Sequence, residues 1–145
     1  MQGSLLVDSS FFISRLGREL DPLTELAEAA GKWEIITRRV VMVEVCRDLE
    51  NEKALDCFIR AFSMMIMITT TAKLWHKAMD LAWRMDRQGK IMQVTGLVIA
   101  PCALEVDATV MTLDSDFLHV PDLTGISRNP LFINECYLDE QTSQR

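Results

Sequence analysis

Short apolar segments alternate with longer segments of helical periodicity along this chain, and this alternation restricts the fold more than any other feature. We expect four strands, each a short apolar segment bounded by polar residues, at 4–7, 33–37, 66–69 and 108–114. Parallel strands need a crossover connection, which is usually a helix, whereas strands joined by tight turns are antiparallel. The alternation therefore predicts an α/β fold, a three-layer sandwich with a central, mainly parallel sheet.

The helical segments are expected between the strands, and several carry residues that suit helix ends. Their spacing of apolar residues predicts helices at 9–20, 21–32, 38–53, 53–65, 70–90 and 94–106. Asp21 followed by Pro22 is typical of a helix start, and Thr37 can cap the helix that follows it. Gly31 and Gly89 suit helix ends. The segment 129–138 is expected to form an edge strand or a short helix, and 136–145 a frayed polar tail.

Length and composition are those of one ordinary globular domain spanning 1–145. The chain has 145 residues, of which 49% are hydrophobic and 25% charged. No apolar run reaches the roughly 18 residues of a membrane span, and the first residues lack the pattern of a secretory signal. The four cysteines show no CxxC spacing, which favours reduced thiols and a cytoplasmic location.

The net charge of −6 excludes a general nucleic-acid binder that acts through a basic surface. It does not exclude an enzyme that holds metal ions in an acidic pocket and meets phosphates through the metals. Arg84, Arg87 and Lys90 form only a modest basic stretch, which solvation of a helix end explains equally well.

Acidic residues stand where two of the predicted strands end. Asp8 follows the strand at 4–7, and Asp114, with Asp116 close behind, ends the strand at 108–114. In open parallel sheets, sites form beyond the carboxyl ends of the strands. Glu44 is a carboxylate in the otherwise apolar helical turn "VVMVEV", so it is a candidate to point toward the domain. Taken singly, Asp114 is also explained by a turn and Glu44 by a solvated helix face.

Carboxylates that converge need a compensating cation. At about 4 Å and an effective dielectric of about 20, each pair repels by roughly 4 kcal/mol. Oxygen ligands without histidine suit Mg²⁺ or Mn²⁺. Such ions generate hydroxide and stabilise the charge that develops on a phosphodiester. The acidic residues therefore predict a metal-dependent phosphodiesterase site.

Three blocks of the sequence, "LLVDSSFF", "VVMVEV" and "GLVIAPCALEVDATVMTLDSDF", resemble those of PIN-domain ribonucleases, particularly the VapC-like toxins of toxin–antitoxin pairs. The resemblance covers about Leu5 to Val120, and the last block is the most specific. It implies an α/β fold with a parallel sheet and an acidic pocket that binds Mg²⁺ or Mn²⁺ and hydrolyses RNA. It also implies a homodimer and a small antitoxin protein as partner.

The resemblance assigns a role to individual residues. Asp8, Glu44 and Asp114 match the acids of the family, and Asp116 is a nearby supporting carboxylate. Ser9 and Thr112 match small hydroxyl positions that can hydrogen-bond the acids or the phosphate. A further residue, Arg38, is either a phosphate contact or a solvated arginine at a helix start.

One acid of the family pattern is missing, because Gly96 stands where an aspartate is expected. Three explanations are open: an engineered substitution, a natural degenerate site, or a site whose remaining acids still hold one metal. Each of them predicts weakened metal binding. Thr95 can still cap the helix. Pro101 either interrupts that helix, at a cost of about 3 kcal/mol, or opens it after an extended "LVIA" segment.

Three other functions compete with the nuclease. A haloacid dehalogenase-type phosphatase needs a second aspartate where Ser10 stands, and a receiver domain needs paired acids and a late lysine, neither of which is evident. The main alternative is an inactive PIN-like interaction module. Its candidate surface is formed by the segment 57–67 and the helix around Trp75 and Trp83.

Overall fold

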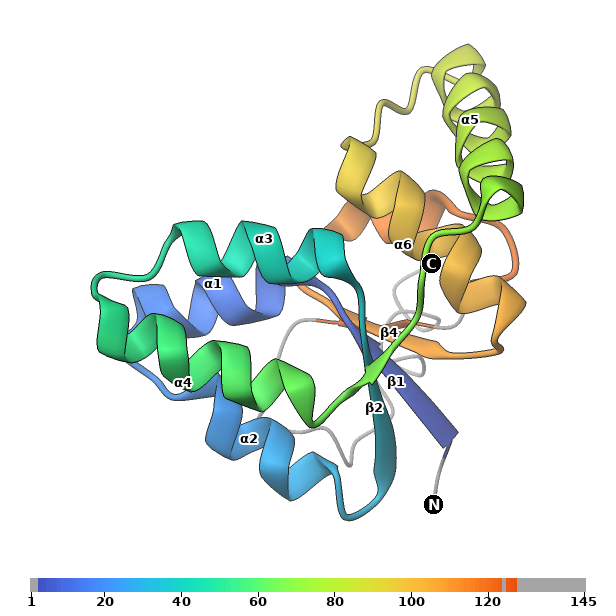
Figure 1. The fold of residues 1–145 in the computed structure, drawn as a ribbon. Helices are drawn as coiled ribbons and strands as arrows, with labels where there is room; N and C mark the ends of the chain where they lie inside the picture. Colours follow the sequence, from blue (N-terminus) through green and yellow to red (C-terminus); the bar gives the residue numbers. More distant parts are fainter. Residues whose placement is uncertain (1–2, 124, 128–145) are drawn as a thin grey trace.

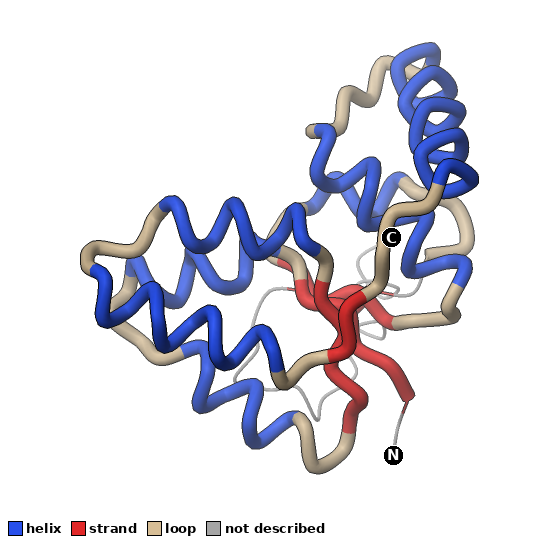
Figure 2. Tube along the Cα trace, in the orientation of Figure 1, coloured by secondary structure: helices blue, strands red, loops and turns tan. Residues whose placement is uncertain are grey.

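The computed structural model describes residues 3–123 and 125–127 and contains a five-stranded sheet flanked by six α-helices (Figures 1 and 2). The strand order is β3-β2-β1-β4-β5, and all four pairings are parallel. The strands are β1 (Gly3–Val7), β2 (Trp33–Thr37), β3 (Ile66–Met67), β4 (Thr109–Thr112) and β5 (Gly125–Ser127). The predicted α/β sandwich with a parallel sheet is confirmed; β5 is an addition to the predicted strands.

The helices occupy the crossovers between the strands, as the alternation in the sequence predicts. They are α1 (Ser9–Gly17), α2 (Pro22–Ala29), α3 (Arg39–Arg47), α4 (Glu52–Ser63), α5 (Ala72–Arg87) and α6 (Val94–Glu105), followed by the 3₁₀-helix η1 (Ser115–His119). In Figure 1, α5 and α6 form a pair that stands apart from α1 to α4. None of these helices has the length and hydropathy needed to cross a bilayer.

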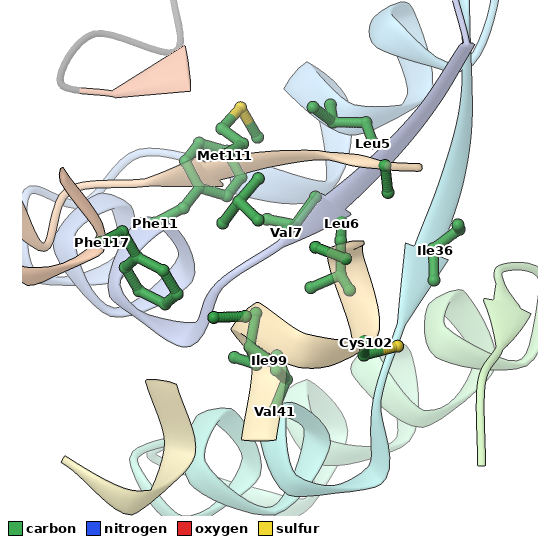
Figure 3. Close-up of a cluster of buried hydrophobic side chains, with 14 of the residues drawn as sticks. Leu5, Leu6, Val7, Phe11, Ile36, Val41, Ile99, Cys102, Met111 and Phe117 are labelled. Atoms are coloured by element: carbon green, nitrogen blue, oxygen red, sulfur yellow. The ribbon is translucent and has the colours of Figure 1, made fainter. Parts of the chain in front are cut away.

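The core lies on both sides of the two central strands, β1 and β4. Successive residues of a strand point to opposite faces. Accordingly, Leu6 lies with Val41 of α3 and Ile99 of α6, whereas Leu5 and Val7 point the other way (Figure 3). Because both faces of β1 are buried, its apolar residues form a continuous run, and Asp8 is the first polar side chain after it.

Several helix ends differ from the prediction. Asp21 caps α2 by accepting a hydrogen bond from Leu23 N at 3.0 Å, as expected. Thr37, however, is a strand residue, and Arg38 occupies the N-cap position of α3 without a side-chain capping bond. The long helix expected from 38 onward ends at Arg47, because Asn51 starts α4 by accepting from Ala54 N at 2.9 Å.

Helix α6 contains Pro101, so the alternative of an extended segment that ends at this proline is wrong. The residues on both sides of Pro101 are buried, and this burial offsets the missing backbone hydrogen bond. Gln93, not Thr95, is the N-cap residue of this helix, and Thr95 lies inside its first turn. Gly89, with φ of +75°, follows the end of α5 as predicted. The segments 129–138 and 136–145 lie outside the described residues.

A buried ion pair joins α1 to α2. Arg15, only 1% exposed, donates from Nε to the Glu25 carboxylate, whose oxygens lie 3.1 and 3.2 Å away. The guanidinium also lies over the ring of Phe11, 5.5 Å from its centroid. One of the two terminal nitrogens, Nη2, is buried without a partner among the described residues. Glu25 therefore supplies the main compensation for a charge buried in the core.

Candidate functional site

A pocket of about 410 Å³ lies at the carboxyl ends of β1 and β4. Asp8 follows β1 directly, and Asp114 comes two residues after β4. Glu44 of α3 and Gly96 of α6 line the same pocket. Four segments that are distant in the sequence thus meet in one cavity. None of the described residues that line it is Lys or Arg.

The Asp8 carboxylate is buried and held by two hydroxyl groups. Ser10 Oγ lies 2.7 Å and Thr112 Oγ1 2.8 Å from Asp8 Oδ2. Thr112 therefore lies against the acid, as the resemblance implies. Ser9 is buried and lines the pocket, but the hydroxyl that binds Asp8 belongs to its neighbour, Ser10.

Both hydroxyls also accept a backbone hydrogen bond from the segment that follows β4. Leu113 N donates to Ser10 Oγ and Asp114 N donates to Thr112 Oγ1, each at 2.9 Å. The backbone of Asp8 is tied to the same strand, because Asp8 N donates to Met111 O at 2.9 Å. Asp8 and the chain that carries Asp114 are thus joined by three separate hydrogen-bond routes.

Asp114 has a local role as well as a place in the pocket. Its Oδ1 accepts a hydrogen bond from Asp116 N at 2.9 Å and so caps η1. Asp114 therefore does form the turn that the sequence suggested, but only one of its two carboxylate oxygens takes part in it. Asp116 lies in the first turn of η1 and is not among the residues that line the pocket.

The Glu44 carboxylate contains an oxygen that lacks a partner. Its Oε1 is buried and accepts no hydrogen bond from any described residue. A buried acceptor without a partner costs about 1–3 kcal/mol, and more if the group is charged. A cation in the pocket would remove this cost, so the Glu44 side chain fits a metal ligand better than a solvated helix face.

Gly96 is closely covered by another side chain. A Cβ atom at this position would lie 2.4 Å from Met92 Cε and 3.3 Å from Met92 Cγ. Met92 itself is buried in the core. The volume that an acid at position 96 would need is therefore filled by a thioether side chain.

Arg38 is not among the residues that line this pocket. Its side chain is 1% exposed and donates to Thr70 Oγ1, so a solvated arginine at the start of a helix is wrong. It also lies beside Cys102, where burial raises the pKa of the thiol and the guanidinium opposes that shift. Its Nε and Nη1 have no partner in the described chain.

The donor set fits a hard divalent cation, but the carboxylates do not form a complete set of ligands. Carboxylate and hydroxyl oxygens are the ligand types that Mg²⁺ and Mn²⁺ prefer. Yet in residues 3–123 and 125–127, no group of three Asp, Glu, His or Cys side chains is arranged to hold a metal ion. Asp8, Glu44 and Asp114 would therefore have to move closer to one another to share one ion.

Comparison with solved structures reveals the fold family. Over 86% of this chain and 98% of the other, the structure matches VapBC2 from Rickettsia felis, bound to a promoter DNA fragment, with a TM-score of 0.70 and 18% identity. It also matches a toxin–antitoxin complex from Klebsiella pneumoniae (TM-score 0.63, 17% identity, 88% and 98% of the two chains). The chain has the PIN-domain fold of VapC toxins.

One of the similar structures belongs to a toxin whose activity is known. VapC20 from Mycobacterium tuberculosis, a toxin that cleaves the sarcin-ricin loop, matches with a TM-score of 0.57 and 18% identity, over 80% of this chain and 94% of that one. No protein-family model and no curated protein matches the sequence. At these identities the similarity establishes the fold, which the sequence blocks predicted.

Proposed function

We propose that this protein is a metal-dependent endoribonuclease that hydrolyses RNA phosphodiester bonds and acts as the toxin of a toxin–antitoxin pair. The observation that carries the proposal is the meeting of Asp8, Glu44 and Asp114 in one pocket, in which a buried Glu44 oxygen lacks a partner among the described residues. The PIN-domain fold and the toxins among the similar structures support the same activity.

In this proposal Asp8, Glu44 and Asp114 hold Mg²⁺ or Mn²⁺, and Asp116 supports them from η1. The metal supplies an activated water and neutralises the charge that develops on the phosphodiester. The chain itself contributes carboxylates that follow β1 and β4 or lie on α3, so the sheet and this helix carry the ligands to one pocket before RNA binds. Gly96 provides no carboxylate, so we expect this pocket to bind a metal ion more weakly than a pocket with four acids would.

The partners follow from the same similarity. We propose a small antitoxin protein that binds this chain, a homodimeric toxin and a cytoplasmic location. A basic side chain of the antitoxin among the three carboxylates would replace the metal and inhibit the enzyme. Cys46, Cys57 and Cys102 carry free thiols in the described part of the chain, and a reducing compartment would keep them so.

The test is cleavage of single-stranded and structured RNA with Mn²⁺ and with EDTA. We expect metal-dependent cleavage by this chain, loss of cleavage in Asp8→Ala, and faster cleavage when the acid at position 96 is restored. Asp80→Ala is the matched control, because Asp80 is an exposed carboxylate on α5, outside the pocket. Cleavage that persists in EDTA or in Asp8→Ala would contradict the proposal.

A second candidate function, an inactive PIN-like module that binds a protein, is favoured by two observations. Met92 fills the place of the missing acid, and an apolar pocket of about 420 Å³ opens between α2 and the end of α4. Met64 and Ile66 line this pocket and are exposed. RNA left intact by both this chain and its restored form, together with tight binding of a partner, would favour the module.

A further inference from the structure

The two hydroxyl groups beside Asp8 have a fixed direction of donation. A backbone N–H can only donate, so Ser10 Oγ and Thr112 Oγ1 act as acceptors toward Leu113 N and Asp114 N. Each hydroxyl has one proton, and each lies within 2.8 Å of Asp8 Oδ2. Both protons therefore point at this single oxygen. The 3.1 Å approach of the two hydroxyls to each other then uses neither proton.

This arrangement makes the two oxygens of Asp8 unequal. Oδ2 accepts two hydrogen bonds, whereas Oδ1 accepts none from the described residues. Asp8 lines the pocket, so Oδ1 is the oxygen that remains for a ligand there. A carboxylate with one oxygen fully engaged cannot rotate without breaking both bonds.

We propose that Ser10 is a positioning residue that, with Thr112, orients Asp8 so that Oδ1 binds the divalent ion. This inference rests on the proposed function only in taking a divalent ion as the ligand. Ser10 lies on α1 and its hydroxyl is bound by the backbone of Leu113, so it also fixes the distance between Asp8 and the segment that carries Asp114. Partners that orient metal ligands in this way affect metal affinity although they do not touch the metal.

The test is Mn²⁺ binding to the full chain by calorimetry, with thermal unfolding of each metal-free variant recorded in parallel. We expect Ser10→Ala to weaken Mn²⁺ binding by about 10-fold or more, and Ser10→Thr, which keeps the hydroxyl, to recover most of this loss. The matched control is Ser4→Ala, since Ser4 also donates to a carboxylate, Glu34, but on the exposed start of β1. Ser4→Ala should bind Mn²⁺ as the parent does.

Each outcome separates the positioning role from a general structural role. Ser10→Ala with a lowered Tm but unchanged Mn²⁺ affinity would overturn the inference, because the hydroxyl would then serve only to join α1 to β4. Equal affinities for Ser10→Ala and Ser10→Thr, both weaker than the parent, would overturn it as well. If the parent binds no Mn²⁺, with or without an acid at position 96, the proposed metal site fails first and the positioning role with it.

Discussion

Met92 lies against Gly96 so closely that a Cβ atom on the glycine would lie 2.4 Å from the Met92 methyl group. A side chain at position 96 would therefore have to displace the end of the Met92 side chain. The nearest atom belongs to the flexible end of the Met92 side chain, but that side chain is buried and the Cγ and Sδ atoms lie within 3.4 Å as well. Restoring the acid thus requires the Met92 side chain to shift, and a smaller residue at position 92 would remove the conflict.

We predict that Gly96→Asp alone lowers the free energy of unfolding by about 1–3 kcal/mol through overpacking, as measured by urea denaturation. Adding Met92→Ala makes room, so the double variant should lose less than the two single variants together. It should also bind Mn²⁺ about 10-fold or more tightly than the parent, because ligand charge strongly affects affinity. Gly17→Asp is the control, since no atom lies within 4 Å of a Cβ there. Independent effects at 92 and 96 would contradict the contact.

Glu44→Gln is predicted to have opposite effects on stability and on metal binding. In the metal-free protein it removes the charge from a carboxylate whose buried Oε1 has no partner among the described residues, and the variant should be more stable by about 1 kcal/mol. Its Mn²⁺ affinity should fall by at least about 10-fold, because a negative ligand is lost. Glu28→Gln, on the exposed side of α2, should change stability by less than about 0.5 kcal/mol. A less stable Glu44→Gln variant would show that the carboxylate has a partner.

The buried pair of Arg15 and Glu25 is predicted to be costly to break from one side only. Glu25→Gln leaves the Arg15 charge buried without its carboxylate and should cost about 3 kcal/mol in urea denaturation. The double variant Arg15→Met with Glu25→Leu should cost much less, because two apolar side chains replace the pair and no charge is left buried. The exposed Arg84–Asp80 pair on α5 is the control, and Asp80→Asn should cost under about 0.5 kcal/mol. A double variant as unstable as Glu25→Gln would contradict this account of the pair.

The thiol of Cys102 is predicted to react only when the protein unfolds. Burial raises the pKa of this thiol above the ordinary 9.0, so the unfolded chain releases the proton at lower pH than the folded one. The resulting contribution to stability is complete below pH 9 and is lost as the pH rises through the folded pKa. In a Cys136→Ser background, a thiol reagent at about pH 8 should label the exposed Cys57 first, Cys46 more slowly and Cys102 last, because the thiolate is the reactive form. Labelling of Cys102 at the rate of Cys57 would contradict its burial.

Much of the fold can be predicted because buried strands and helices leave a regular spacing of apolar residues in the sequence. The strand predicted at 33–37 has the observed bounds, and its last three residues are buried. The convergence of Asp8 and Asp114 follows from the parallel sheet, in which strand ends share one edge. The break between α3 and α4 escapes prediction because Asn51 caps a new helix within an apparently continuous pattern. The strand β5 is too short to stand out from a loop.

The details of the site depend on tertiary contacts, which the spacing of apolar residues in the sequence does not predict. Ser10 is not among the predicted site residues, although a hydroxyl two residues after the acid, in the first helical turn, is visible in "VDSS". That position allows a side chain to reach back to the acid. Arg38 could not be placed, because only the tertiary structure buries it beside Thr70. The contact between Met92 and Gly96 likewise joins a loop to a helix and leaves no signature in the sequence.

The candidate ligands are carried by secondary-structure elements of different kinds. Asp8 and Asp114 follow the two neighbouring strands β1 and β4, whereas Glu44 is carried by the helix α3. Local openings of a native protein start where few buried contacts hold the backbone, and the central strands open last. A detachment of α3 would withdraw one ligand, but it would also expose Val41 and Val45, which are buried in the core. The rate at which the ion exchanges by this route would then depend on how firmly a single helix packs against the core.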